Sequence, residues 1–540
     1  MRRGNGGVFL TASLCCAAGV GAAAGLLFVR AVPAATPQER VNAAYAAMGG
    51  DKLKTITLQA HVEQYDPGES YSLADPAKPD EGASDLVQSR DLVHGLTRNE
   101  WIRPKADDGT KRTFTEIITP SAGCSIGNDA TAGRLPKRTN KNTPPAHTMS
   151  GRRLTMNLRE LERSTIVGEM KQHPDKVTAA IADQTLAGKI YPAVQYRDDR
   201  GTFIVMFDPA TNLPARVRTR DWDGLEGDSD FDAEYSDWRD LGGAKIAFET
   251  HYTLNGRKIA DVQLSGAIAN PTLPAATFDI PLAMLASAAK PADADATPFQ
   301  WILRMEFGGW YFDSDAMYTD DGDDLKLVDV APNVSQTRGS THNTIFIATN
   351  SYLVAVEAPY SDGYSRAAIE LAKQKYPAKP IRYLILTHHH FDHVSGMRTY
   401  AAEGATIVVG KGDGNYIRKA LTEPETLNPN APKIVSPPKV IEVDGKWSVK
   451  DGGREVDAYV IDNPHSADML IAYVPDAKLG VVTDLYFPGP PVPSNAMIAA
   501  LVKGVDKWGI KPEQFAGGHG TVGPYAGVVQ AAQKVPASGQ

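Results

Sequence analysis

A histidine-rich segment, Thr387–His393, constrains the fold and chemistry of this chain more than any other part of the sequence. It directly follows an apolar run, Ile381–Leu386, which is typical of a buried strand. Because side chains alternate along extended backbone, we expect His388 and His390 to point to one side and His389 to the other. Such a strand end brings two imidazoles to one point in space, and imidazole nitrogen is a preferred ligand of Zn²⁺ and related divalent ions.

Further residues able to bind a metal follow in the same segment and at three later strand ends. Asp392 and His393 lie one turn beyond the first pair, where they can serve a second, nearby ion. His465, Asp484 and His519 each lie beside an apolar, strand-like segment, and the glycines around His519 allow its loop to fold closely around an ion. A chance cluster of surface or core histidines would not account for these later donors. The pattern therefore predicts a metal site built from imidazoles and carboxylates.

The order His-x-His-x-Asp-His, then His, then Asp, then a His before Gly resembles the metallo-β-lactamase superfamily of hydrolases. The resemblance covers roughly Leu325 to Val535 and implies a four-layer αββα sandwich with its site at the strand ends along one edge. It also implies two metal positions that share one carboxylate. The implied ligands are His388, His390 and His465 for the first ion, Asp392, His393 and His519 for the second, and Asp484 as the bridge. His389 matches a variable position of the motif and is not expected to bind.

The residues at three positions limit which members of the superfamily this chain resembles. Glu357 stands where the family often has an Asp that orients a ligand histidine. Asp484 is similar to the bridging residue of lactonases, glyoxalase-type thioesterases and phosphodiesterases, whereas class B β-lactamases generally lack it. Flavodiiron proteins tend to have Glu where this chain has His390, which argues against an oxygen-reducing di-iron centre.

The implied ligands suggest a reaction. Coordination to a divalent ion lowers the pKa of water from 15.7 toward about 7, so a hydroxide nucleophile exists at neutral pH. Asp392 and Asp484 are the candidate catalytic residues, because they moderate the charge of the metal pair and can pass a proton to the leaving group. Tyr486 is a candidate oxyanion donor, but packing at a strand end is the better supported interpretation. For His342 we expect a surface or supporting role.

The sequence thus predicts an exported metal-dependent hydrolase that uses a metal-bridged hydroxide to cleave an ester, lactone, thioester or related bond. Its cofactors would be two divalent ions, zinc by preference and iron or manganese as alternatives. Its partner would be a small-molecule substrate, with a hydrophobic one as a candidate. Two other hypotheses stay open: a mononuclear iron dioxygenase of the persulfide type, and a lipid-binding envelope protein whose metal domain is not catalytic.

The N-terminus indicates export. Arg2 and Arg3 precede an uncharged, largely apolar stretch, and small residues follow at Ala31–Ala35. Residues 1–35 therefore predict a signal peptide, with an N-terminal membrane anchor as the alternative, and a periplasmic or secreted location. Removal of this segment leaves Cys124 as the one remaining cysteine, so no intramolecular disulfide can form.

The chain of 540 residues is long enough for two or three domains. We expect an α+β protein in which residues 36–282 form an antiparallel, curved, half-barrel-like sheet. Ala247–Leu254, Asn255–Gly256 and Arg257–Leu264 predict one of its hairpins, since Asn-Gly favours a type I′ turn. Residues 283–320 predict a linker and docking segment, and residues 321–540 the metal domain.

The N-terminal half also resembles, more weakly, the outer-membrane lipoprotein-sorting proteins. The segments that carry this resemblance are Ala47–Gly50, Phe207–Pro214, Tyr235–Gly243 and Asn270–Pro281. The family implies an apolar concave face that holds a lipid, although a plain accessory sheet explains the pattern equally well. The net charge of −8 argues against a nucleic-acid partner, and the basic stretch Arg134–Arg153 predicts a solvated loop.

Overall fold

The computed structural model describes residues 35–536, except for 66–67, 76–82, 105–110, 130–143, 179–180, 295–296 and 309–324. The chain divides into two compact units, Met1–Thr36 and Pro37–Gln540. The expected leader, residues 1–35, therefore lies almost wholly outside the described residues. Among the residues that are described, no helix has both the length and the apolar character needed to cross a bilayer.

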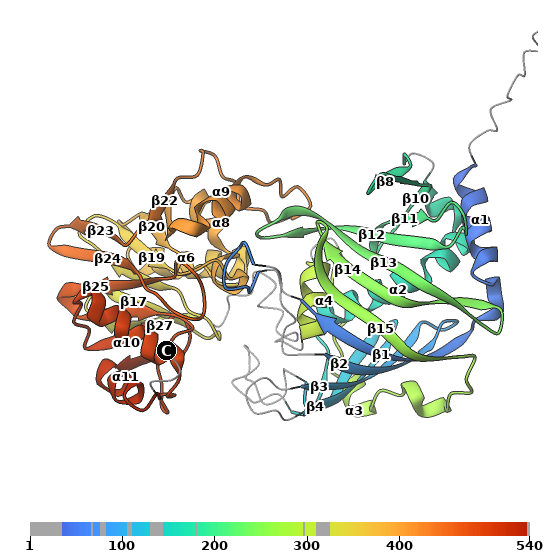
Figure 1. The fold of residues 1–540 in the computed structure, drawn as a ribbon, viewed down its shortest axis with the longest axis horizontal. Helices are drawn as coiled ribbons and strands as arrows, with labels where there is room; N and C mark the ends of the chain where they lie inside the picture. The colour runs from blue at the N-terminus through green and yellow to red at the C-terminus, as the bar shows by residue number, and fades with distance from the viewer. Residues whose placement is uncertain are drawn as a thin grey trace, which may run out of the picture. The chain divides into compact units, whose positions relative to one another are not determined.

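The first half of the second unit is one large antiparallel sheet (Figure 1). The sheet has 13 strands in the order β6-β5-β4-β3-β2-β1-β15-β14-β13-β12-β11-β10-β7. Their bounds are β1 Thr55–Gln64, β2 Ser84–Asp91, β3 Leu96–Pro104, β4 Lys111–Thr119, β5 Ala122–Gly127, β6 Ala146–Thr148, β7 Val177–Thr178, β10 Ala193–Asp198, β11 Gly201–Phe207, β12 Pro214–Asp223, β13 Gly227–Leu241, β14 Ala244–Leu254 and β15 Arg257–Ala269. A separate hairpin pairs β8 (Gln184–Leu186) with β9 (Lys189–Tyr191). The predicted antiparallel domain is confirmed.

The β14–β15 hairpin forms where the sequence predicts it. Leu254 pairs with Arg257 across a two-residue turn, in which Asn255 has φ 49° and Gly256 has φ 78°. Positive φ at both central positions is what a type I′ turn requires, and Asn and Gly tolerate it best. The turn therefore fixes the register of β14 and β15 where they begin to pair.

Helices of the same half cover one face of this sheet. They are α1 (Pro37–Ala47), α2 (Gly151–Gln172) and α4 (Phe299–Gly308), and α4 contacts both α2 and strands β1, β12 and β15. The sheet, α2 and α4 leave between them a cavity of about 90 Å³. Ligand pockets usually measure about 300–1,000 Å³. The face that a lipid would need is therefore packed by the chain's own helices.

The basic stretch Arg134–Arg153 was expected to be a solvated loop, but its C-terminal end belongs to helix α2. Ser150 caps the helix by accepting from the Arg153 backbone N–H, and Arg153 is fully buried. Its guanidinium lies 2.6 Å from a Glu116 carboxylate oxygen and 3.1 Å from Asp129. The prediction of a solvated loop is wrong for this residue, because buried carboxylates neutralise it; Arg134 to Thr143 lie outside the described residues.

The described part of the predicted linker is packed onto the sheet domain, whereas its residues 295–296 and 309–320 lie outside the described residues. It contains a short helix, α3 (Leu282–Leu285), and Ala292 donates from its backbone N–H to the Gly151 carbonyl at 3.1 Å. Helix α4 follows and carries the aromatic residues Phe299, Trp301 and Phe307. Phe299 packs edge-on against Phe231 of β13, with ring centroids 6.1 Å apart.

The second half contains two further sheets. The first has the order β16-β17-β18-β19-β20-β21-β22 and the second β23-β24-β25-β26-β27-β28. The bounds in the first are β16 Lys326–Ala331, β17 Val334–Arg338, β18 Ile345–Ala348, β19 Leu353–Val356, β20 Ile381–Ile385, β21 Thr406–Gly410 and β22 Val440–Val443. Those in the second are β23 Lys446–Asp451, β24 Arg454–Val460, β25 Leu470–Val474, β26 Leu479–Val482, β27 Gln514–Gly517 and β28 Val522–Pro524. The helices are α6 Asp362–Lys375, α7 Phe391–Val394, α8 Met397–Ala402, α9 Gly414–Thr422, α10 Ala496–Trp508 and α11 Tyr525–Ala532.

The buried side chains define four layers in this half. Alternate residues of β18 face opposite ways, as a strand requires. Ile345 and Ile347 join a core shared with the second sheet, whereas Phe346 joins the core beneath α6 and α8. Residues of α10 and α11 cover the outer face of the second sheet. The order helix–sheet–sheet–helix is the predicted αββα sandwich.

Candidate metal centre

The predicted donors lie on loops that follow strands β20, β24, β26 and β27. His388 and His390 come directly after β20, and helix α7 then carries Asp392 and His393. The remaining donors, His465, Asp484 and His519, follow β24, β26 and β27 respectively. The structure thus brings all seven predicted donors together from the connections that follow four strands.

One group of donors contains His388, His390, His465 and Asp484, whose candidate ligand atoms all lie within 4.8 Å of one another. The Nε2 atoms of His388 and His465 are 3.2 Å apart. They lie 3.1 Å and 3.0 Å, respectively, from Asp484 Oδ2. Three imidazoles and one carboxylate at these separations match the donor set expected for the first ion.

A second group contains His342, Asp392, His393 and His519. Asp392 Oδ2 accepts from His342 Nε2 at 2.9 Å and lies 3.5 Å from His393 Nε2. His342 is also held by an isolated β-bridge to His519. The sequence singled out His342 only as a surface or supporting residue. Its buried place in the group was missed, because it precedes β18 and has no donor near it in sequence.

The carboxylate of Asp484 lies between the two groups. Besides its contacts in the first group, Oδ2 lies 3.0 Å from His393 Nε2, and Oδ1 lies 2.8 Å from His519 Nε2. Asp484 has φ 46°, a left-handed conformation that is uncommon for residues other than glycine. Backbone in such sparsely populated regions clusters at functional sites. Here it turns the carboxylate toward both groups.

In several of these imidazoles, the ring nitrogen that faces away from the two groups contacts an oxygen atom. We call it the outward nitrogen. His393 Nδ1 is in short contact with Glu357 Oε2, and His388 Nδ1 lies 3.0 Å from Thr387 Oγ1. The carbonyl of Thr341 lies 3.2 Å from His519 Nδ1. Such contacts fix which nitrogen of each ring faces the centre. Glu357 therefore occupies the place in which the family often has Asp.

His389 points away from the two groups, as predicted. Its Nδ1 lies 3.1 Å from Asp413 Oδ1, and its Nε2 lies 3.0 Å from the carbonyl oxygen of Ser70. Burial raises the pKa of Asp413, and the contact with His389 opposes that rise. His389 thus pairs with a buried carboxyl group and with the sheet domain.

Burial also shifts the titration of the donors. It lowers the pKa of His390 to about 3, with help from His465 and His389, and that of His342 to about 3, with help from His519. For His393, burial acts in the same direction, but Asp392, Asp484 and Glu357 outweigh it and raise its pKa well above the usual value. The rings of His390 and His342 are therefore neutral and able to bind a cation through a nitrogen lone pair.

The residues present fit bound divalent metal ions. Asp392 Oδ1 is buried and has no hydrogen-bond partner, which is costly unless a cation satisfies it. Nitrogen and carboxylate donors in these numbers suit zinc, and iron and manganese accept the same ligands. The structure supports metal binding by these clusters and leaves the identity and number of ions open to experiment.

Tyr486 packs against its surroundings. It is 2% exposed, and burial raises its pKa. A Cβ atom built on Gly523 would approach the Tyr486 hydroxyl to 2.3 Å, so the ring fills space against this glycine. This arrangement agrees with the interpretation of Tyr486 as a packed residue.

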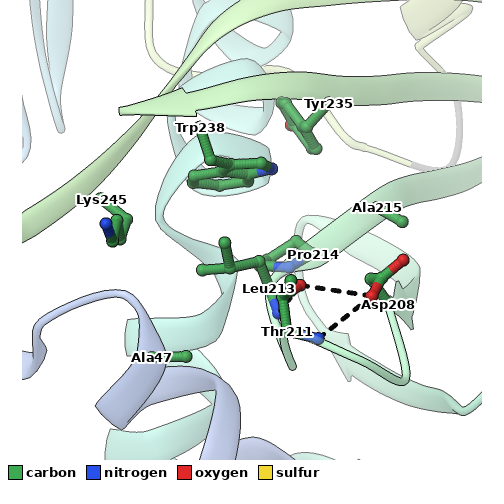
Figure 2. Close-up of a pocket in the computed structure, with 9 residues that line it drawn as sticks. All are labelled: Ala47, Asp208, Thr211, Leu213, Pro214, Ala215, Tyr235, Trp238 and Lys245. Carbon is green, nitrogen blue, oxygen red and sulfur yellow. Dashed lines mark hydrogen bonds between the residues drawn. The ribbon is translucent and has the colours of Figure 1, made fainter. Parts of the chain in front are cut away.

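A separate hollow of about 610 Å³ lies in the sheet domain (Figure 2). Trp238, Tyr235 and Leu213 supply much of its wall, and Lys245 and Asp208 its polar part. The Asp208 carboxylate already accepts from the backbone N–H groups of Ala210 and Thr211 and from Lys189. Three of the segments that resemble lipoprotein-sorting proteins meet at this hollow.

One family model and several solved structures match part of this chain. The family model described as "Metallo-beta-lactamase superfamily" matches residues 337–520. A solved metallo-β-lactamase from Pontibacter korlensis is 15% identical, with a TM-score of 0.32, and the match covers 39% of this chain and 97% of that one. The DIM-1 metallo-β-lactamase is 14% identical, with a TM-score of 0.31, and the match covers 39% of this chain and 95% of that one. The sec-alkylsulfatase Pisa1 from Pseudomonas sp. is 18% identical, with a TM-score of 0.30, and the match covers 44% of this chain and 43% of that one. A comparison with curated protein sequences gives no match.

The C-terminal half is therefore a domain of the metallo-β-lactamase superfamily. This superfamily consists largely of hydrolases. In this chain a large antiparallel sheet domain precedes the metallo-β-lactamase domain in sequence.

Proposed function

We propose that the protein is an exported, metal-dependent hydrolase that cleaves an ester, lactone, thioester or related bond. The observation that carries this proposal is the place of Asp484 between two complete donor groups. A purely structural metal site would not need a carboxylate shared between two clusters. His388, His390 and His465 would hold one ion, and Asp392, His393 and His519 the other, with His342 as a further donor or as the partner of Asp392.

Two divalent ions, zinc by preference, would supply Lewis acidity and the lowered pKa of a bridging water at this centre. The protein's own contribution is orientation and proton handling. Glu357 and Thr387 turn His393 and His388 so that their Nε2 atoms face Asp484. Asp392 and Asp484 are the proposed catalytic residues. Asp392 would hold an ion through its unpartnered Oδ1, and its Oδ2, which lies 2.9 Å from His342 Nε2, could pass a proton to the leaving group.

The rim of the site favours a substrate with an apolar part. Phe487 is 53% exposed, and its ring centroid lies 4.4 Å from that of His519. An exposed aromatic ring beside a donor histidine offers apolar contact at the second group. We therefore infer a small-molecule substrate that carries a hydrophobic group next to the scissile bond.

Export is proposed from the N-terminal sequence and agrees with the side chains used. The donors include no thiolate, and Cys124 is buried and free. Histidine and carboxylate ligands persist under oxidising conditions in which thiols do not. The periplasm or the extracellular medium therefore suits this site, with a membrane-anchored form as the alternative.

Metal analysis followed by a substrate panel tests the proposal. The panel contains chromogenic esters, lactones, thioesters, β-lactams, phosphodiesters and sulfate esters, each assayed with the wild type, His388→Ala and His94→Ala. His94 is exposed and pairs with Asp91 away from the donors, so it controls for the loss of an imidazole. We expect hydrolysis of at least one compound by the wild type and His94→Ala, and none by His388→Ala.

The same samples separate the alternatives. One iron per chain together with oxygen consumption on a persulfide would favour the dioxygenase. Copurified lipid without any hydrolysis would favour a lipid-binding role.

A further inference from the structure

The connection between β1 and β2 brings a short segment of the sheet domain against the donor histidines. We call residues 68–75 the strap. The Ser70 carbonyl oxygen accepts from His389 Nε2 at 3.0 Å and lies 3.1 Å from His390 Nε2. The next carbonyl, that of Tyr71, accepts from the backbone N–H of Ala467 at 2.7 Å. The strap is thus joined to two different loops that carry donors.

The contact with Ser70 completes a pattern among the donor rings. His388, His393 and His519 each have their outward nitrogen against an oxygen of the metal domain itself. For His390, that oxygen belongs to Ser70, which is only 5% exposed. A neutral imidazole has one N–H group, so donation from Nε2 leaves Nδ1 unprotonated. The sheet domain therefore determines which nitrogen of His390 is free to bind an ion.

Glu69 adds a carboxylate beside that free nitrogen. Its Oε2 atom lies 3.2 Å from His390 Nδ1. Two lone pairs that face each other at this distance repel unless a cation or a proton lies between them. Metal–ligand bonds of about 2.0–2.1 Å in a tetrahedral site place neighbouring donors roughly 3.3 Å apart, which matches the observed separation. Glu69 lies at the rim, with 34% of its side chain exposed, and it is not one of the four tightly grouped donors.

We propose that the strap completes the first metal site, with the Ser70 carbonyl positioning His390 and the Glu69 carboxylate serving as an additional, exchangeable donor to the ion. This inference rests on the proposed function, because it assumes that His388, His390 and His465 bind an ion. It makes the sheet domain part of the active centre and gives the β1–β2 connection a defined role. The sequence offered no signal for it, since Glu69 lies more than 300 residues before His390 in an acidic loop.

Zinc affinity of the full-length protein tests the role of Glu69. Glu69→Gln keeps the size of the side chain and removes its charge. Glu100→Gln is the matched control, because Glu100 lies in the same sheet domain and forms an exposed pair with Arg98. Each protein is stripped of metal and titrated with Zn²⁺ against a chromophoric chelator, and the visible spectrum is recorded with Co²⁺ in place of zinc.

We expect Glu69→Gln to weaken the first ion at least tenfold and to alter its Co²⁺ spectrum, with the second ion and the Glu100→Gln control unchanged. A wild type that binds two ions, with Glu69→Gln indistinguishable from it, would overturn the role of Glu69 and leave the proposed hydrolase intact. A wild type that binds no ion would overturn both proposals.

The role of Ser70 is tested by ¹⁵N NMR of histidine-labelled, zinc-loaded protein. The His390 resonances are assigned by their loss in His390→Ala. We expect His390 to carry its proton on Nε2, with Nδ1 bound to the ion. A proton on Nδ1 would overturn the positioning role of the strap, whatever the metal content.

Discussion

Glu357 contacts His393 Nδ1 through one carboxylate oxygen and accepts the backbone N–H of Thr387 at 3.1 Å through the other. This single buried side chain therefore connects the end of β20 with the second donor group. Glu357 has φ 73°, so its backbone departs from the strand just where its side chain must turn toward His393. The longer side chain does here what an Asp does in many relatives of the superfamily.

Glu357→Gln should weaken metal binding at the second group. The amide keeps the size of the side chain but removes the negative charge that helps to raise the pKa of His393. Loss of such an outer partner typically costs 10–100-fold in metal affinity. Zinc titration checks this, with Glu403→Gln as control, because Glu403 forms an exposed pair with Lys373. Equal affinities for the two variants would contradict the orienting role of Glu357.

The adjacent residues His388 and His389 should respond differently to alanine. His388→Ala should abolish turnover and remove an ion while the chain stays folded. His389→Ala should keep both ions and most activity but lose about 1–3 kcal/mol of folding free energy, because buried Asp413 and the Ser70 carbonyl lose a partner. Metal content and urea unfolding measure the two effects. Loss of metal from His389→Ala equal to that from His388→Ala would refute the assignment.

The metal domain could be predicted in detail because its signals are local. Apolar strands end directly at His388, Asp484 and His519, so sequence order alone places the donors at one edge. Helix α10 begins after Asn495, whose side chain accepts from the Ile498 backbone N–H, a cap that asparagine commonly provides. The site residues that were missed, His342 and the strap, are brought in by the tertiary fold.

The sheet domain was harder to predict for a physical reason. Helix α2 buries Arg153, Arg159 and Arg163, each of which is at most 3% exposed. Charged residues are rarely buried unless they are paired, so a sequence rich in them indicates a solvated segment. Here Glu116 and Asp129, from distant strands, pair with Arg153. Only the folded chain shows these partners.

Trp301→Ala should destabilise the protein and disturb the metal centre. Trp301 of α4 packs edge-on against Phe391, with ring centroids 5.4 Å apart, and Phe391 lies between His390 and Asp392 in sequence. Removal of a buried aromatic side chain costs about 3–5 kcal/mol. Urea unfolding should show this loss, and Trp301→Phe should restore most of it. A loss below about 1 kcal/mol for Trp301→Ala would contradict tight packing of α4 beneath the site.

Glu162→Gln should stabilise the chain at neutral and alkaline pH. Burial, assisted by Asp198, raises the pKa of Glu162 to about 9 from its ordinary value of 4.5. Between these two pH values the folded chain holds a proton that the unfolded chain releases, so stability falls as pH rises through this window. The glutamine variant has no such proton to lose. Its unfolding free energy should exceed that of the wild type at pH 8 by several kcal/mol and equal it near pH 4. An identical pH dependence would contradict the raised pKa.

The number of divalent ions per chain tests the central claim most directly. Elemental analysis of the purified wild type should give two ions per chain. Asp484→Asn, which keeps the shape of the shared side chain and tolerates its left-handed backbone, should lower that number and abolish turnover. A wild type with no bound ion, or an Asp484→Asn variant that keeps two ions and full activity, would contradict a centre built around Asp484.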